Sequence, residues 1–124
     1  MTPSPIYEAI PKQLAAALPE LAPAYEKEAL SYAPEPLPPT VFVEDFFIPF
    51  LLEQAQRKQT AALGRCLAFL DELAQSEDPD TLNLLGTSVA EPLLAHPTVL
   101  SQVIGAARPR LRMVLIRVRD WPRR

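Results

Sequence analysis

The sequence predicts an all-α fold, a compact bundle of about six short helices with some solenoid-like stacking of the later helix pairs. The first observation is that apolar residues recur at three- and four-residue spacing along most of the chain. The second is that the chain has 15 prolines but only three glycines and a single asparagine, so it has few residues for tight hairpin turns. The third is that prolines bound the apolar stripes, and proline suits the first turn of a helix.

The N-terminal third contains two predicted helices and a connector. A short helix is expected over 11–18 and a second one from residue 23, because prolines divide the apolar stripe. The residues of the second helix expected to face the core are Tyr25, Ala29 and Tyr32. Residues 33–39, APEPLPP, are predicted to form a stiff connector, because a residue that precedes proline is driven toward extended conformations.

The centre of the core is predicted in a strongly apolar helix over 41–58, which carries four of the five phenylalanines. Thr40 is expected to cap the N-terminus of this helix, and Pro49 is expected to kink or split it. The next helix is expected over 60–75, with the thiol of Cys66 buried on its inner face.

The C-terminal half has the clearest helix boundary of the chain, the segment SEDPD. There Asp78 is expected to cap a helix that starts at Pro79 and runs until Pro92, and further helices are expected from Pro97 and Pro109. The last segment, RPRLRMVLIRVRDW, alternates like a strand, but helical spacing fits its apolar residues without a miss: Leu111, Val114, Leu115, Val118 and Trp121.

The three glycines fall within predicted helices, at positions 64, 86 and 105. Glycine in a helix costs about 1 kcal/mol relative to alanine, so a compensating benefit is expected. The sequence therefore predicts that each glycine allows a close helix crossing.

Length and composition predict a single domain over residues 1–124. With 48% hydrophobic and 22% charged residues, neither disorder nor a membrane class is indicated. The N-terminus lacks the pattern of a signal peptide, and one cysteine cannot form an intrachain disulfide. We therefore expect a cytoplasmic protein.

Charge is distributed unevenly along the chain. Residues 1–107 hold five Lys and Arg against 14 acids, a net charge of −9, whereas residues 108–124 hold seven arginines against one acid, a net charge of +6. We expect the basic end to fold back onto the acidic body, with Arg112 and Arg119 facing carboxylates of neighbouring helices. Nucleic acid is an improbable partner, because the sequence pI is near 5.1 and Trp121 is the sole aromatic residue of this segment.

No catalytic, cofactor or metal site is recognisable from residue types. One histidine and one cysteine cannot supply a His/Cys zinc site, and three scattered glycines cannot cradle a phosphate. His96 lies between prolines and is expected to act as a partial helix cap. An alternative is a ligand-binding or enzymatic bundle with a phenylalanine-lined pocket from the 41–52 helix, near Glu44, Asp45 or His96.

The stretch from Phe69 to Leu94, FLDELAQSEDPDTLNLLGTSVAEPLL, resembles small bacterial all-helical domains of unassigned function. Those domains carry a similar helix ending in an "FLE-x-L" run, an acidic gap, "D-x-x-x-x-N-L-L" and "V-x-E-x-L". The resemblance extends over 21–121, and some of these domains resemble immunity proteins encoded beside toxins. The matching residues are Phe69, Leu70, Leu73, Asp78, Asp80, Asn83, Leu84, Leu85, Val89, Glu91 and Leu94.

The resemblance implies a helical fold and a non-enzymatic interaction protein, in particular an immunity-type inhibitor whose acidic face binds a basic toxin. It also directs attention to Asn83 and Glu91, which lie eight residues apart. A structural interpretation stands beside it, in which Asn83 bonds nearby backbone and Glu91 pairs with an arginine of the last helix. The candidate surface residues are Asn83, Glu91, His96, Arg112 and Arg119.

Removal of residues 108–124 is expected to destabilise the domain, because the aliphatic side chains of the last helix would leave the core. Burying each such side chain contributes about 1.5–3 kcal/mol, so their loss should exceed the stability margin of a typical domain. Thermal melting followed by circular dichroism tests this. An unchanged cooperative melt of the truncated protein would show that the segment is a tail.

Overall fold

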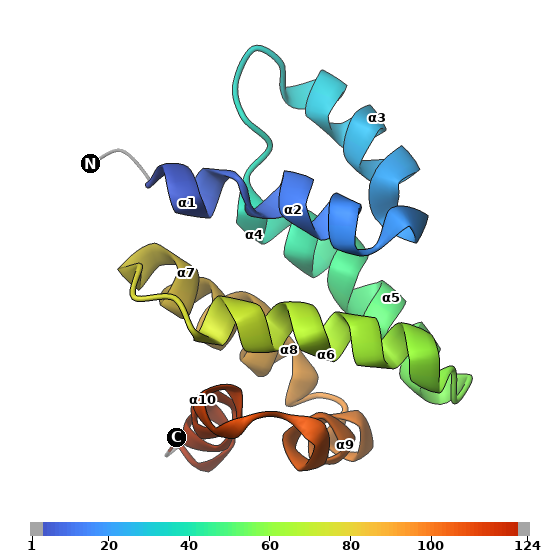
Figure 1. Cartoon of the computed structure of the whole chain (residues 1–124), viewed down its shortest axis with the longest axis vertical. Coiled ribbons are helices and arrows are strands. Elements are labelled where there is room, and N and C mark those ends of the chain that lie inside the picture. The colour runs from blue at the N-terminus through green and yellow to red at the C-terminus, as the bar shows by residue number, and fades with distance from the viewer. Residues whose placement is uncertain (1–3, 122–124) are drawn as a thin grey trace.

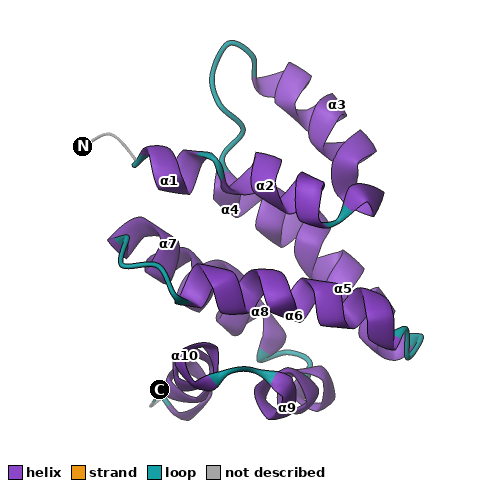
Figure 2. Ribbon diagram, viewed as in Figure 1, coloured by secondary structure: helices purple, strands orange, loops and turns teal. Residues whose placement is uncertain are grey.

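The computed structural model describes residues 4–121, which form helices joined by short links and contain no strand (Figure 2). This confirms the predicted all-α bundle. The helices are α1 (Pro5–Glu8) and α2 (Ile10–Ala17); the 3₁₀ turn η1 (Pro19–Leu21) continuing into α3 (Ala22–Tyr32); α4 (Pro39–Phe42), the π-helical turn η2 (Val43–Phe47) and α5 (Ile48–Gln56) in one rod; α6 (Thr60–Ala74); α7 (Pro79–Leu84), the π-helical turn η3 (Leu85–Ala90) and α8 (Glu91–Leu93) in another; α9 (Pro97–Ala106); and α10 (Pro109–Asp120).

Proline starts most of these helices, as the composition predicts. The clearest case is α7, where the Asp78 carboxylate accepts hydrogen bonds from the Thr81 backbone N–H at 3.0 Å and from its hydroxyl at 2.7 Å. The prediction for Thr40 is wrong: α4 starts at Pro39, one residue earlier, so Thr40 lies inside the helix. The short helix α1 is not predicted by the apolar stripe; Ser4 caps it by accepting from Tyr7 N–H at 3.1 Å.

Two prolines inside helices each follow a widened π-helical turn. The backbone N–H of Ile48, just before Pro49, donates to the carbonyl of Val43, and that of Glu91, just before Pro92, donates to the carbonyl of Gly86. Proline has no N–H, and its ring presses on the carbonyl four residues earlier. A π-helical turn re-routes the carbonyls to donors five residues on. Both rods therefore run on through their prolines, so the predicted split at Pro49 and the predicted end of a helix at Pro92 are not found; each proline is instead accommodated by a π-helical turn.

The two π-helical turns pack against one another and share a hydrogen bond. The hydroxyl of Ser88 in η3 donates to the Glu44 carboxylate in η2 at 2.7 Å. Ser88 is fully buried, and Glu44 reaches it from an exposed position on its rod. A buried hydroxyl needs a partner, so this bond fixes how the two rods cross.

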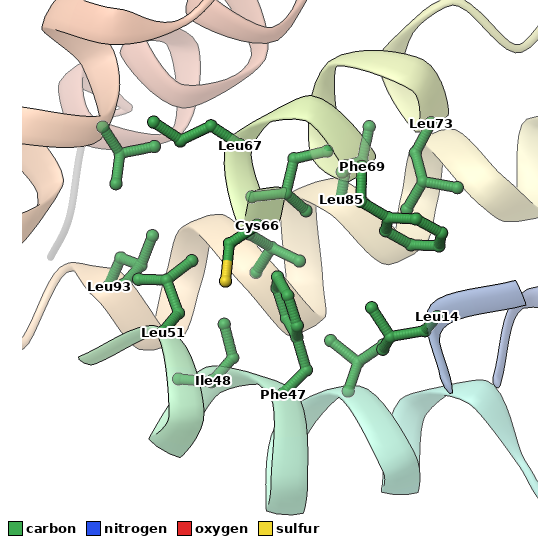
Figure 3. Close-up of a cluster of buried hydrophobic side chains, with 14 of the residues drawn as sticks. Leu14, Phe47, Ile48, Leu51, Cys66, Leu67, Phe69, Leu73, Leu85 and Leu93 are labelled. Carbon is green, nitrogen blue, oxygen red and sulfur yellow. The ribbon is translucent and has the colours of Figure 1, made fainter. Parts of the chain in front are cut away.

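The core is organised around α6, which packs against α2, α5, α7, η3 and α10 (Figure 1). Phe42 and Phe47, from the segment predicted as the core centre, are 0% and 1% exposed. The Cys66 side chain is buried among them, with its sulfur directed toward Ile48 and Leu51 (Figure 3). No helix within residues 4–121 is both long and apolar enough to cross a membrane.

Helix α3 lies at the edge of the bundle and buries none of its residues. The expected inward stripe is only partly realised: Tyr25 meets the Phe42 ring edge-on at 5.8 Å, whereas Tyr32 is exposed. The 3₁₀ turn η1 that precedes α3 is held to α6 by Glu20, whose carboxylate accepts two hydrogen bonds from Arg65 at 2.6 and 2.8 Å. These bonds lower the pKa of Glu20 to about 2. Within the proline-rich connector, Leu37 is the buried anchor.

The glycines do not mark close helix crossings, so that prediction is wrong. At each of Gly64, Gly86 and Gly105, an added Cβ would meet no neighbouring atom within 4 Å. Gly64 and Gly105 are exposed, and Gly86 is half-buried. The helices leave open space at all three positions.

The basic C-terminal segment folds as a core helix. Leu111 and Leu115 of α10 are fully buried, and Val114 and Val118 pack against the core at its edge. Trp121 is the exception to the predicted inner stripe, since it is 61% exposed. The helix ends at Asp120 and Trp121 adopts extended backbone angles, so the helical phase no longer directs its side chain inward.

Replacing Ser88 by alanine is expected to lower the free energy of unfolding by about 1–2 kcal/mol, because the bond between the two π-helical turns is lost. The matched control is Thr87→Ala, next in sequence but exposed, whose hydroxyl bonds only the Asn83 carbonyl. The control should change stability by about 0.5 kcal/mol or less. Urea unfolding of the two variants measures the difference, and equal effects would contradict the role assigned to Ser88.

Burial raises the pKa of the Cys66 thiol to about 12 from an ordinary value of 9.0. The folded protein therefore keeps a proton that the unfolded chain releases, and this contribution to stability is complete below pH 9.0 and lost as the pH rises toward 12. The free energy of unfolding should fall more steeply with pH in this range for the natural protein than for Cys66→Ala. Parallel slopes would refute the assignment.

Candidate interaction groove

A groove runs along the outside of α10, between this helix and the rod formed by α7, η3 and α8. Two hollows lie in it, of about 220 and 260 Å³. The first is lined by Ala74, Leu82, Arg110, Met113, Val114 and Arg117, and the second by Gly86, Thr87, Glu91, Arg117, Val118 and Trp121. Arg117 lines both hollows, so they adjoin at this side chain, and the two together are called the groove below.

The outer edge of the groove carries Arg110, Met113, Arg117 and Trp121. The spacing of three and four residues places Arg110, Met113 and Arg117 along one side of α10, and Trp121 follows directly after the end of the helix. Met113 is 60% exposed and Trp121 is 61% exposed. Arg117 makes no ion pair or hydrogen bond with residues 4–121, and Arg110 makes only a long contact of 3.5 Å with the carbonyl of Gln75.

The floor of the groove is apolar and shallow. Leu82, Val114 and Val118 are partly buried against the core. At Gly86 the rod presents no side chain, and the space above it is open. The groove thus combines an apolar floor, the exposed side chains of Met113 and Trp121, and two arginines, Arg110 and Arg117, that form no ion pair with residues 4–121.

The other arginines of α10 are occupied, and not in the way the sequence predicts. Arg112 donates to the carbonyls of Ile104 at 3.1 Å and Ala107 at 2.7 Å, so it caps the end of α9 instead of facing a carboxylate. Arg119 pairs with Asp120, its neighbour in sequence, at 2.9 Å. The last carbonyls of a helix have no intrahelical donor, so they can accept hydrogen bonds from a nearby guanidinium.

The structure separates Asn83 from Glu91. Glu91 lines the second hollow beside Arg117, whereas Asn83 is exposed on α7 and lines neither hollow. The Asn83 carbonyl accepts from the Thr87 hydroxyl at 2.9 Å. Glu91 shares the hollow with an arginine of α10, but the two form no ion pair there.

His96 stands at the N-cap position of α9, but its side chain makes no capping hydrogen bond. It lines a separate hollow of about 350 Å³ together with Lys58 and Gln102. Lys58, in the link between α5 and α6, adopts a left-handed backbone conformation with φ of 56°. The predicted cap is thus correct in position and not in bonding.

The phenylalanines of the 41–52 segment line none of the hollows of about 220, 260, 350 and 610 Å³ on the described part of the chain. Phe42 and Phe47 are core residues, and Phe46 stacks on Phe42 at 5.6 Å. Glu44 is engaged by Ser88, and His96 lies at another hollow. Within residues 4–121, no three His, Cys, Asp or Glu side chains come together in a way that could hold a metal ion.

A second feature is the acidic surface around Tyr7, on the opposite side of the bundle from α9. The pKa of Tyr7 is raised by partial burial and by the negative charges of Asp80 and Glu44. Carboxylates from two separate rods thus act on the titration of one phenol. Neither makes an ion pair within the described part of the chain.

Sequence reasoning missed the groove residues Arg117, Met113 and Gly86. The available signal was that Met113 and Arg117 fall outside the inner stripe of α10, on the face opposite Leu111 and Leu115. The second wall of the groove comes from residues about 30 positions earlier in the chain, and helical spacing carries no information about that pairing.

These features define the class of protein: an all-helical domain with a shallow groove and no recognisable catalytic cluster among its described residues. The chain belongs to the family named Domain of unknown function (DUF7674), whose model matches residues 11–121. No curated protein and no solved structure matches the chain. Membership in a family of unassigned function agrees with the resemblance of the 69–94 segment.

Trp121 is the single tryptophan of the chain, so its fluorescence reports directly on the groove. Because Arg117 lies beside it, the ratio of iodide to caesium quenching is expected to be about twofold higher at low salt than for free N-acetyltryptophanamide. Arg117→Glu should lower this ratio to the free value or below, and the matched control Lys27→Glu, on exposed α3, should not. A ratio equal to that of the free indole would show that no positive field surrounds Trp121.

Proposed function

We propose that this chain is a non-enzymatic protein-interaction domain that binds another protein through the groove beside α10. The observation that carries the proposal is the exposure of Met113 and Trp121 on either side of unpaired Arg117. Tryptophan, methionine and arginine are enriched at protein interfaces, and tryptophan and arginine dominate their binding energy.

The rigidity of the groove supports the same function. Both walls are helices whose inner faces are fully buried, through Leu111 and Leu115 on one side and Leu84 and Leu85 on the other. A partner would meet a surface already in place, so little free energy would be spent on ordering it.

Site-specific photocrosslinking in the native cells tests the proposal. The photoreactive residue benzoylphenylalanine replaces Met113 in the full chain, and a matched control chain carries it at Leu30, which is 79% exposed on α3. A discrete crosslinked protein is expected from position 113 and not from position 30. Identical products from both positions, or none from position 113, would contradict a binding role for the groove.

An immunity-type inhibitor is the second candidate function, favoured by the acidic residues Glu44 and Asp80, whose negative charges both raise the pKa of Tyr7. Such a surface would attract a basic toxin and speed association. This function requires that the chain block the activity of a toxin encoded beside it. Asp80→Asn should slow that inhibition, with Glu26→Gln on α3 as control. Inhibition insensitive to Asp80 would exclude this surface.

A further inference from the structure

We propose that the groove beside α10 takes an acidic amphipathic helix of a partner protein. This rests on the proposed function and names the chemistry of the partner. The groove walls are two helical rods, and a helix lying between two helices is a recurrent way of recognising a peptide.

The dimensions of the groove suit a short helix. From Arg110 to Trp121 the outer wall spans eleven residue steps, about 16 Å, which corresponds to about three turns of a partner helix. The two hollows follow one another along this length, on either side of Arg117. A partner helix with apolar residues about seven positions apart would place one anchor in each hollow.

Charge complementarity selects an acidic partner. The cations available in the groove are Arg110 and Arg117, since Arg112 and Arg119 are already bonded. Arg117 stands between the hollows, where a carboxylate on the partner helix between its two apolar anchors would meet it. Guanidinium groups bind carboxylates through two parallel hydrogen bonds, which adds orientation as well as attraction.

Two other occupants fit the groove less well. A second copy docked groove to groove would bring Arg110 and Arg117 toward their own equivalents, and like charges oppose such an isologous contact. A polynucleotide is bound through many phosphates, and among the described residues this groove offers it two guanidinium groups, Arg110 and Arg117. Binding of a second copy and binding of a polynucleotide are both distinguished by the experiment that follows.

Titration of the full chain with designed peptides tests the inference, with Trp121 emission as the signal. The probe is a helical peptide of about 14 residues with leucine at i, i+3 and i+7 and glutamate at most other positions. A saturable blue shift is expected, because the peptide covers the exposed indole. A scrambled peptide and one with lysine for glutamate should bind at least about tenfold more weakly.

Two pairs of variants separate the groove from general effects. Gly86→Leu fills the groove at a position with open space, so the fold is retained, and Gly105→Leu on exposed α9 is its matched control. The double variant Arg110→Glu and Arg117→Glu is matched by Lys12→Glu and Lys27→Glu, exposed on α2 and α3. Each groove variant should weaken binding at least about tenfold and each control less than about twofold. Circular dichroism melting confirms that all are folded.

Several results would overturn the inference. They are the absence of a saturable shift with the acidic peptide, equal binding of the scrambled or lysine peptide, and equal binding to Gly86→Leu. Sedimentation showing dimers that Gly86→Leu disrupts would assign the groove to a second copy, and salt-sensitive duplex DNA binding lost with the arginines would assign it to nucleic acid. A basic protein crosslinked at position 113 would reject the acidic helix while leaving the interaction function in place.

Discussion

The contact between the two π-helical turns is the constraint on which the arrangement of this bundle depends. Pro49 and Pro92 each deprive a helix of one donor, and the backbone before each proline widens to satisfy the carbonyls. The widened turns meet, and the buried Ser88 hydroxyl bonds Glu44 across them. This crossing fixes the rod of α7, η3 and α8 relative to the rod of α4, η2 and α5. Because α10 packs against η3, the groove inherits its position from the same crossing.

The arginines of α10 show how one residue type has different roles on one helix. Arg112 terminates α9 by bonding its last carbonyls, and Arg119 is held by the adjacent Asp120. Arg117 has neither kind of partner among residues 4–121, although the Glu91 carboxylate lines one of the same hollows. The uneven charge of the chain therefore does not translate into a uniform basic surface. It leaves few available cations, and these stand next to the exposed Met113 and Trp121.

The sequence predicts those parts of the structure that depend on neighbours along the chain. Asp78 and Pro79 specify the start of α7, and the spacing of Leu111 and Leu115 specifies the inner face of α10, because capping and periodicity are local. It does not predict the groove, since this requires knowing which rod lies beside α10. The predicted inward position of Trp121 is wrong for a related reason. The residue at which a helix ends decides whether the next apolar side chain still points inward, and α10 ends at Asp120. The prediction that each glycine allows a close helix crossing fails because such a crossing depends on where the other helices pack, and none comes close at these three positions.

The position of α3 at the margin of the bundle divides the molecule into regions of unequal local stability. No side chain of this helix is fully buried, and it is attached through the Tyr25–Phe42 ring contact, the exposed Glu20–Arg65 pair before it and Leu37 after it. Its backbone amides can reach solvent through a local opening that leaves α6 and the crossing of the π-helical turns intact. Hydrogen exchange would then separate a fast unit at α3 from a slow unit centred on α6. The segment from 22 to 36 is consequently where the chain can accommodate insertions or proteolytic nicks with the least effect on the remainder.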